Sequence, residues 1–387
     1  MPTHPLPPLS LYIHIPWCIK KCPYCDFNSH TAGSNIPEQA YLNTLLKDLD
    51  QDLKYVQGRA IKSIFIGGGT PSLFSPQGFA FLLTAINDKL ELLPNAEITL
   101  EANPGAVEQQ SFSGFLTAGI NRLSIGVQSF SNQKLHSLGR IHSAAEATKA
   151  MVSAKKAGFK QINLDLMFGL PEQNLAEALN DLQQAVDLGP QHISWYQLTL
   201  EPNTVFYNTP PPLPDDEGIE DMQTKGLEFL SRHGYQRYEV SAYATDNNVS
   251  KHNLNYWRFG DYIGIGAGAH SKITQPIQGA KGENFAIERY WKTRMPADYL
   301  SLDKGFLAGS HLIPADELPL EFMMNALRLS KGFKPDLFAQ HTGRKLSCIA
   351  KNLEQARLKG LLIQSDSTIK ATELGYRYLN DLLQLFM

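Results

Sequence analysis

The chain has 387 residues, of which 43% are hydrophobic and 19% are charged, and its 35 basic and 38 acidic residues give a net charge of −3. This balance excludes a strongly basic nucleic-acid coat protein and a highly charged disordered chain. The sequence has no uninterrupted apolar stretch of membrane-spanning length, and its start, MPTHPLPPLS, lacks the pattern of a secretory signal. We therefore expect a cytoplasmic protein, and peripheral attachment to a membrane stays open.

The first 200 residues alternate between two kinds of pattern. Apolar, β-branched runs predict strands at 11–15, 63–69, 97–104, 122–130, 161–170 and 192–200. Between them, helical spacing and end signals predict helices at 38–55 and 81–90, one ending near Gly119, one at 143–157, and one ending at Gly189. Such alternation implies parallel strands joined by crossover helices. Because polar residues stand at strand ends, we expect an α/β fold of the partial TIM-like (β/α)6 barrel type, with an open Rossmann-type sheet as the alternative.

The regular alternation of predicted strands and helices ends after residue 200. A Pro-rich loop at 209–218 precedes a helix ending at His233, the segment RYEVSAYA at 237–244, and a Gly-rich aromatic stretch. From Pro314 the chain is mainly helical, with a hairpin predicted at 360–372, an order typical of a winged-helix-like domain. We expect three parts, namely a core at 1–236, an extension completing the core at 237–305, and the C-terminal helical domain at 306–387.

Three of the four cysteines form the pattern C-x3-C-x2-C, namely Cys18, Cys22 and Cys25. Clustered thiolates in a reducing compartment indicate zinc, copper(I) or an iron–sulfur cluster. Three thiolates on a [4Fe-4S] cluster leave one iron free for a small chelating molecule. A zinc site completed by His14 or His30 is the alternative. We expect Cys348 to be a small buried hydrophobic residue in a helix.

Tyr24 stands before the last of these cysteines, and the chain also contains the strings YIHIPWC, GGGTPS, EANP, RLSIGVQSF, LGRIH and INLDLMFGLP. Together with the three cysteines, these features resemble the radical S-adenosylmethionine (SAM) superfamily. Within it they resemble the oxygen-independent coproporphyrinogen III oxidase-like family. The resemblance implies that SAM chelates the open iron and is cleaved reductively to a deoxyadenosyl radical. It also implies a SAM site formed by Tyr12, Gly68, Gly69, Thr70, Glu101, Gln128, Arg140 and Asp165. In that site the glycines have no side chains, so a ligand can approach their backbone closely. Carboxylates inside apolar strands need partners, which ribose hydroxyls or an ammonium group could supply. Arg140 could pair with the carboxylate of SAM.

Two features of the sequence indicate which branch of this family the chain resembles. Members that oxidise coproporphyrinogen carry a further cysteine two residues after the third cluster cysteine, where this chain has Phe27. The string HNLNYW at 252–257 is similar to the H-N-x-x-Y-W motif of the HemW-type haem-chaperone branch. It implies haem ligation by His252, with Tyr256 and Trp257 against the macrocycle. His270 is a further haem candidate, or lies against SAM.

The function expected from this resemblance is to bind haem and deliver it to a haem-requiring acceptor protein, such as a respiratory enzyme at the membrane. The alternatives are an oxygen-independent coproporphyrinogen III dehydrogenase, another radical SAM enzyme, or a zinc-stabilised scaffold. A winged-helix shape also suits DNA binding, but the sequence has no concentrated basic stripe, so we expect no nucleic-acid partner. Homodimer formation stays open.

Overall fold

The computed structural model describes residues 5–33, 35–277, 285–301 and 305–387, and within them one sheet has twelve strands in the order β14-β13-β12-β11-β1-β4-β5-β6-β7-β8-β10-β9. Neighbouring strands from β11 to β8 in this order run parallel. Their bounds are β1 (Leu9–Ile15), β4 (Ile61–Gly68), β5 (Leu92–Ala102), β6 (Arg122–Gln128), β7 (Gln161–Phe168), β8 (His192–Gln197) and β11 (Asp261–Ile265).

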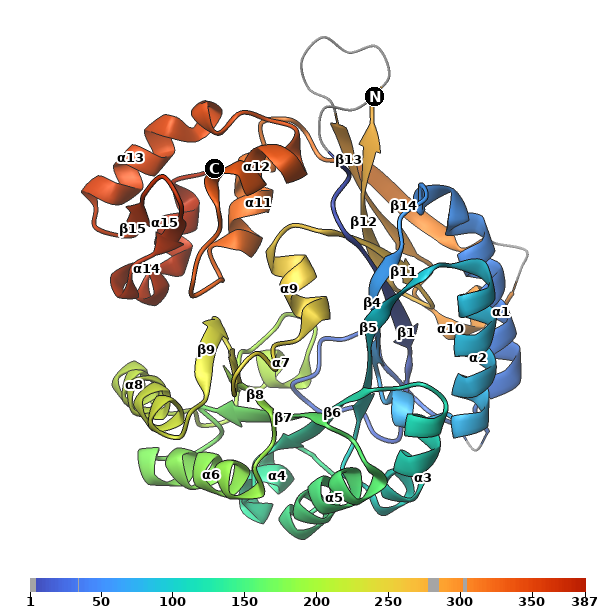
Figure 1. The fold of residues 1–387 in the computed structure, drawn as a ribbon. Helices are drawn as coiled ribbons and strands as arrows, with labels where there is room; N and C mark the ends of the chain where they lie inside the picture. The colour runs from blue at the N-terminus through green and yellow to red at the C-terminus, as the bar shows by residue number, and fades with distance from the viewer. Residues whose placement is uncertain (1–4, 34, 278–284, 302–304) are drawn as a thin grey trace.

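Helices follow the first six parallel strands, and the longer ones cover the outside of the curved sheet, as Figure 1 shows. They are α1 (Glu38–Asp52), α2 (Pro76–Lys89), α3 (Ala106–Thr117), α4 (Asn132–Ser137), α5 (Ala144–Ala157), α6 (Leu175–Leu188), α7 (Val205–Asn208) and α8 (Asp216–Arg232). Local sequence sets their ends. Helix α5 starts in a capping box between Ser143 and Glu146 and ends at Gly158, which has a φ of 106°. The predicted (β/α)6 partial barrel is confirmed.

Short strands extend the sheet at both edges. On one side lie β12 (His270–Pro276), β13 (Phe285–Lys292) and β14 (Leu307–Leu312), and on the other β10 (Ala242–Ala244) and β9 (Gln236–Glu239), all antiparallel to their neighbours. The segment 237–244 forms two strands, because a turn at Val240 and Ser241 separates β9 from β10. Strand β11, a seventh parallel strand that pairs with β1, was not predicted.

The short helix α9 (Lys251–Trp257) lies on the inner side of the curved sheet, against β1, β4 and β11 (Figure 1). Its backbone contacts show which end of the barrel it closes. The backbone NH of His252 donates to Glu97 Oε1 at 3.0 Å, and Glu97 lies in the first half of β5. Helix α9 therefore fills the amino-terminal end of the barrel interior and leaves the carboxyl ends of the strands to the loops.

The last 70 residues form a second hydrophobic core that packs on Phe259 and Ile287. Its elements are α11 (Leu318–Ala326), α12 (Pro335–Thr342), α13 (Ala350–Leu358), the hairpin β15 (Leu362–Gln364) and β16 (Ile369–Ala371), α14 (Glu373–Arg377) and α15 (Leu379–Gln384). This is the winged-helix-like order expected from the sequence. The prediction for Cys348 was wrong, because it lies exposed in a 3-10 turn at 346–349 whose buried residue is Ile349.

Two buried aspartates attach α1 to the sheet extension. Lys292 Nζ at the end of β13 lies 2.6 Å from Asp48 and 2.7 Å from Asp52, and all three side chains are almost fully buried. On the solvent side of the same helix, Asp50 pairs with Lys89, and both of these side chains are partly exposed. The chain thus offers a buried and an exposed ion pair on one helix.

We expect Lys292→Met to lower the free energy of unfolding by about 3 to 5 kcal/mol, because it leaves two buried carboxylates without a cation. The matched variant Lys89→Met should cost less than about 1 kcal/mol, because its partner is exposed to water. Chemical denaturation of the two variants measures the difference. Equal losses would contradict the assigned role of Lys292.

Candidate functional site

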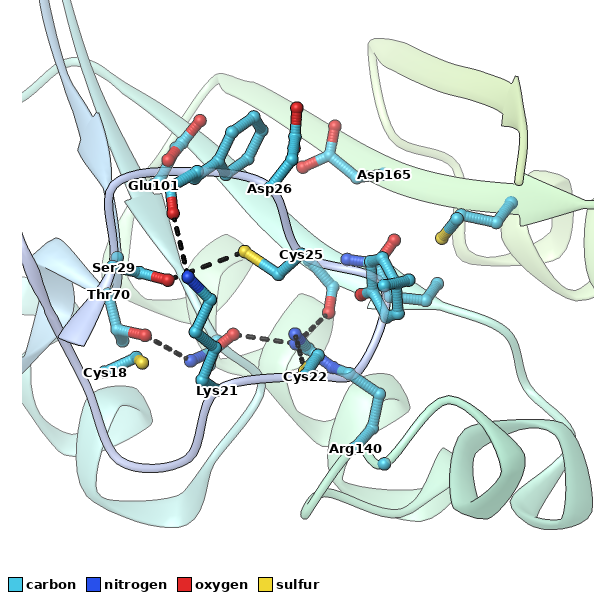
Figure 2. Close-up of a pocket in the computed structure, with 18 of the residues that line it drawn as sticks. Cys18, Lys21, Cys22, Cys25, Asp26, Ser29, Thr70, Glu101, Arg140 and Asp165 are labelled. Carbon is cyan, nitrogen blue, oxygen red and sulfur yellow. Dashed lines mark hydrogen bonds between the residues drawn. The ribbon is translucent and has the colours of Figure 1, made fainter. Parts of the chain in front are cut away.

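A cavity of about 470 Å³ lies at the carboxyl ends of β4 to β8, next to the loop that follows β1. Ten residues predicted as cluster or SAM ligands line it, namely Cys18, Cys22, Cys25, Gly68, Gly69, Thr70, Glu101, Gln128, Arg140 and Asp165. Figure 2 shows the cysteines between the acidic pair Glu101 and Asp165 on one side and Arg140 on the other. Active sites of α/β barrels occupy this end of the strands.

The base of the cysteine loop is closed by two short parallel strands, β2 (Trp17–Cys18) and β3 (His30–Thr31). This pairing fixes Cys18 next to the chain that returns toward α1, with its Sγ 3.7 Å from the carbonyl oxygen of His30. Burial and the neighbouring Cys25 and Cys22 raise the pKa of the Cys18 thiol. A bound metal would reverse this shift, because it stabilises the thiolate.

The other two cysteines lie further along the same loop. Cys22 Sγ lies 3.8 Å from Arg140 Nη1, and Cys25 Sγ lies 3.6 Å from Ser29 Oγ. As they stand, no three His, Cys, Asp or Glu side chains in the described part of the chain are grouped closely enough to hold a metal ion. Three thiol groups on one loop facing one cavity nevertheless fit an iron–sulfur cluster by the chemistry of the donors.

The three glycines at the end of β4, 67–69, bring the backbone close to the cysteine loop. The NH of Gly69 donates to Ile15 O, and the NH of Thr70 to Trp17 O, both at 2.7 Å. A Cβ on Gly69 would lie 2.4 Å from Trp17 O, and Gly68 has a φ of 117°. Larger residues are therefore excluded here by contact and by backbone conformation.

Two partly buried carboxyl groups share the opposite wall. Glu101 Oε2 accepts one hydrogen bond from the NH of Gly68, and Asp165 accepts from Ser124 Oγ and Asn163 Nδ2. Burial, and then the nearby Asp165, raise the pKa of Glu101 to about 8, and burial also raises the pKa of Asp165. No described Lys or Arg forms an ion pair with either group, so this wall is suited to a cationic ligand.

Gln128 and Arg140 complete the cavity on the β6 side. Gln128 has a φ of 68°, an uncommon conformation for a residue other than glycine, and its side chain accepts a hydrogen bond from Tyr196. Arg140 Nη2 donates to Asn103 Oδ1 at 2.7 Å and to Gly126 O at 2.9 Å. Both side chains are thus held at the edge of the cavity by fixed partners.

Asn103 and Tyr196 also line the cavity, and neither was predicted as a site residue. Asn103 connects two predicted residues, because it also donates to Thr70 Oγ1 at 2.9 Å. Its position two residues after Glu101, in EANP at the end of β5, was the available signal. For Tyr196 the sequence contains no comparable signal, because its partner Gln128 belongs to another strand.

Tyr12 does not line this cavity but a second one, together with His14, Tyr256 and His270. His14 Nε2 donates to the carbonyl oxygen of Asn28, so its Nδ1 accepts from the Tyr12 hydroxyl, at 2.8 and 2.9 Å. Both ring nitrogens of His14 are therefore in use, which disfavours the zinc alternative through this residue.

His252 and Trp257 lie outside both cavities. The side chain of His252 is 3% exposed, its Nδ1 lies 3.1 Å from Ser63 Oγ, and its Nε2 is buried without a hydrogen bond. Burial lowers the pKa of His252 to about 3, so the ring is neutral. Trp257 is covered by the guanidinium of Arg328, 4.3 Å from its ring centre. Haem ligation by His252 stays a prediction, and it would require α9 to move.

Comparison with known proteins gives consistent matches along the chain. The model of the radical SAM superfamily matches residues 12–185, and the HemN C-terminal domain matches residues 313–378. Proteins named heme chaperone HemW from Haemophilus influenzae and Escherichia coli K12 are each 50% identical over 99% of this chain, covering 98% and 99% of their own lengths. The protein of that name from Bacillus subtilis is 34% identical over 98% of this chain and 99% of its own.

The chain belongs to the HemW family of radical SAM proteins. The resemblance inferred from the motifs is thereby confirmed, and membership implies a [4Fe-4S] cluster and SAM. The structure of coproporphyrinogen III oxidase HemN from Escherichia coli matches 99% of this chain and 91% of its own, with a TM-score of 0.81 at 21% identity, which confirms the fold. Among the described helices, none is both long and apolar enough to cross a bilayer.

The raised pKa of Glu101 predicts how SAM binding depends on pH. Below about pH 8 the group holds a proton, and it must lose this proton to pair with the cationic cofactor. Affinity should therefore rise from pH 7 to 9, and binding should release a proton at pH 7 but not at pH 9. Calorimetry of the anaerobic, cluster-loaded protein in buffers of different ionisation enthalpy measures both.

Two variants check the assignment of this proton. Glu101→Gln should remove the pH dependence and weaken binding at pH 9 by about tenfold, the equivalent of one charge-assisted contact. Glu91→Gln, at an exposed carboxylate just before β5, should behave as the unmodified protein. Proton release that persists in Glu101→Gln would assign the titration to another group.

Proposed function

We propose that this chain binds haem and transfers it to a haem-requiring acceptor protein, on a radical SAM core that carries a [4Fe-4S] cluster. The observation that carries the proposal is the 50% identity, over 99% of the chain, to proteins named heme chaperone HemW in two bacteria. At this identity and coverage no part of the chain is left to supply a different substrate domain. We further propose that the acceptor is a respiratory enzyme at the membrane, as the resemblance of the sequence implies.

Phe27 supports a carrier role over oxidation of a porphyrinogen. It stands two residues after Cys25, where porphyrinogen-oxidising members have a cysteine, and its side chain is 59% exposed at the edge of the cavity. A phenyl ring offers neither a thiolate nor a proton. The chain thus lacks a group that those members place beside the cluster.

In the proposed site the cluster is held by Cys18, Cys22 and Cys25, and it supplies an iron that SAM chelates. The backbone around Gly68 and Gly69 leaves room for a ligand to approach closely. Glu101 and Asp165 would pair with positive charge on the cofactor. These roles rest on the cavity that the residues share and on the unpaired carboxyl groups within it.

Arg140 and Gln128 would contact the polar ends of the cofactor. The guanidinium of Arg140 lies beside Cys22 in the cavity, where a carboxylate bound near the cluster would meet it. Gln128 reaches the cavity from the end of β6, and its amide can bond hydroxyl groups of a ribose. Thr70 adds a hydroxyl that Asn103 already orients.

A transfer experiment tests the proposed function. The protein is reconstituted anaerobically, loaded with haem, and mixed with the apo form of a membrane respiratory subunit, while absorbance follows the haem spectrum of the acceptor. We expect haem to reach the acceptor faster from this protein than from albumin loaded to the same level. Failure to bind haem, or conversion of coproporphyrinogen III to protoporphyrinogen IX with SAM and a reductant, would contradict the proposal.

A further inference from the structure

The second cavity, also about 470 Å³, lies beside the cluster loop and is distinct from the first. Its volume is within the range of sites for small organic ligands. The two cavities have only Asp26, Phe27, Gly68 and Glu101 in common. A ligand in the second cavity would therefore lie next to SAM without occupying the cysteine side of the loop.

Aromatic rings form the wall of this cavity opposite the loop. Tyr12 stacks on Phe65 with ring centres 6.3 Å apart, and Tyr256 stacks on Tyr262 at 4.1 Å. All four residues line the cavity, and the exposed ring of Phe27 adds an apolar surface at its mouth. Such a wall can stack against a flat aromatic macrocycle.

Two polar side chains at the mouth have no hydrogen-bond or ion-pair partner among the described residues. Neither ring nitrogen of His270 forms a hydrogen bond with the described residues, although its ring stacks on Trp291 at 6.1 Å. Within the described ranges the guanidinium of Arg294 has no ion pair, while its backbone carbonyl is held by Asn28 Nδ2 at 2.8 Å. An imidazole and a free cation thus stand beside an aromatic wall.

We infer that the second cavity is the haem site, with His270 as an axial ligand of the iron and Arg294 as the partner of a propionate. This rests on the proposed function. One iron–nitrogen bond forms, and water leaves the iron. Tyr256, which the sequence motif also indicated, would lie against the macrocycle. Partial burial, with Arg289 and Arg294 nearby, lowers the pKa of His270, so the ring is in the neutral form that binds iron.

The same geometry gives His252 a structural role. Its ring lies 5.2 Å from that of Tyr256 and 5.1 Å from that of Phe65, behind the aromatic wall. Its Nδ1 bonds Ser63, which in turn bonds Ser10 inside the barrel. In this conformation the ring of His252 packs against Tyr256 behind the aromatic wall, and the His252 ring does not line the cavity.

Haem titration of the full chain, with Soret absorbance and electron paramagnetic resonance, tests the inference. His270→Ala should weaken binding by about tenfold or more and change the axial-ligand signature, and added imidazole should restore that signature. The matched control is His311→Ala, at an exposed histidine on β14 whose ring also lies near Trp291. It should bind haem as the unmodified protein does, and iron and sulfide content should be equal in all samples.

Further variants distinguish the role of the axial ligand His270 from the roles of the residues around it. Arg294→Ala should weaken binding with an unchanged Soret maximum, and Arg294→Lys should recover part of the affinity. His252→Ala should lower thermal stability and keep the axial signature. If His270→Ala keeps the affinity and spectrum of the unmodified protein, or if His252→Ala alone loses the axial signature, the inference is overturned while the proposed function stands. If the unmodified protein binds no haem, the proposed function itself fails.

Discussion

Two partly buried carboxyl groups, Glu101 near the end of β5 and Asp165 within β7, form no ion pair among the described residues. Withdrawing negative charge from water in this way is unfavourable unless a cation binds or a proton stays on. The same cavity is lined by three cysteines and by Arg140. The site is therefore incomplete by itself, and its chemistry is that of a receptor for a cationic, carboxylate-bearing ligand next to a thiolate-bound metal.

The cysteine loop connects this receptor to the proposed haem site. Asn28, three residues after Cys25, donates to the carbonyl oxygens of Ala267 and Arg294. The end of the loop is thus attached to the turn before β12, which begins at His270, and to the segment after β13. The lining shared by the two cavities includes Gly68 and Glu101 from the SAM side. A change in the conformation of the loop when the cluster or SAM binds would thus also move residues that line the second cavity. This offers a physical route by which the radical SAM core can influence haem release.

Local signals explain how much could be predicted from the sequence. Buried parallel strands are continuous apolar runs, and caps such as Ser143 and Gly158 mark helix ends, so the six βα units and the polar strand ends could be predicted. Strand β11 could not, because it follows the short helix α9 and pairs with β1 about 250 residues earlier. The motif at 252–257 gave residue types but not their orientation, and tertiary packing turns His252 inward and Tyr256 toward a cavity.

We propose that three thiolates hold a cubane whose fourth iron is open to SAM. Mössbauer spectroscopy of the anaerobically reconstituted protein, with the iron labelled as 57Fe, tests this arrangement. We expect a [4Fe-4S] cluster in which one iron site changes its isomer shift when SAM is added. A protein that takes up zinc and no iron, or a cluster whose four sites ignore SAM, would contradict it.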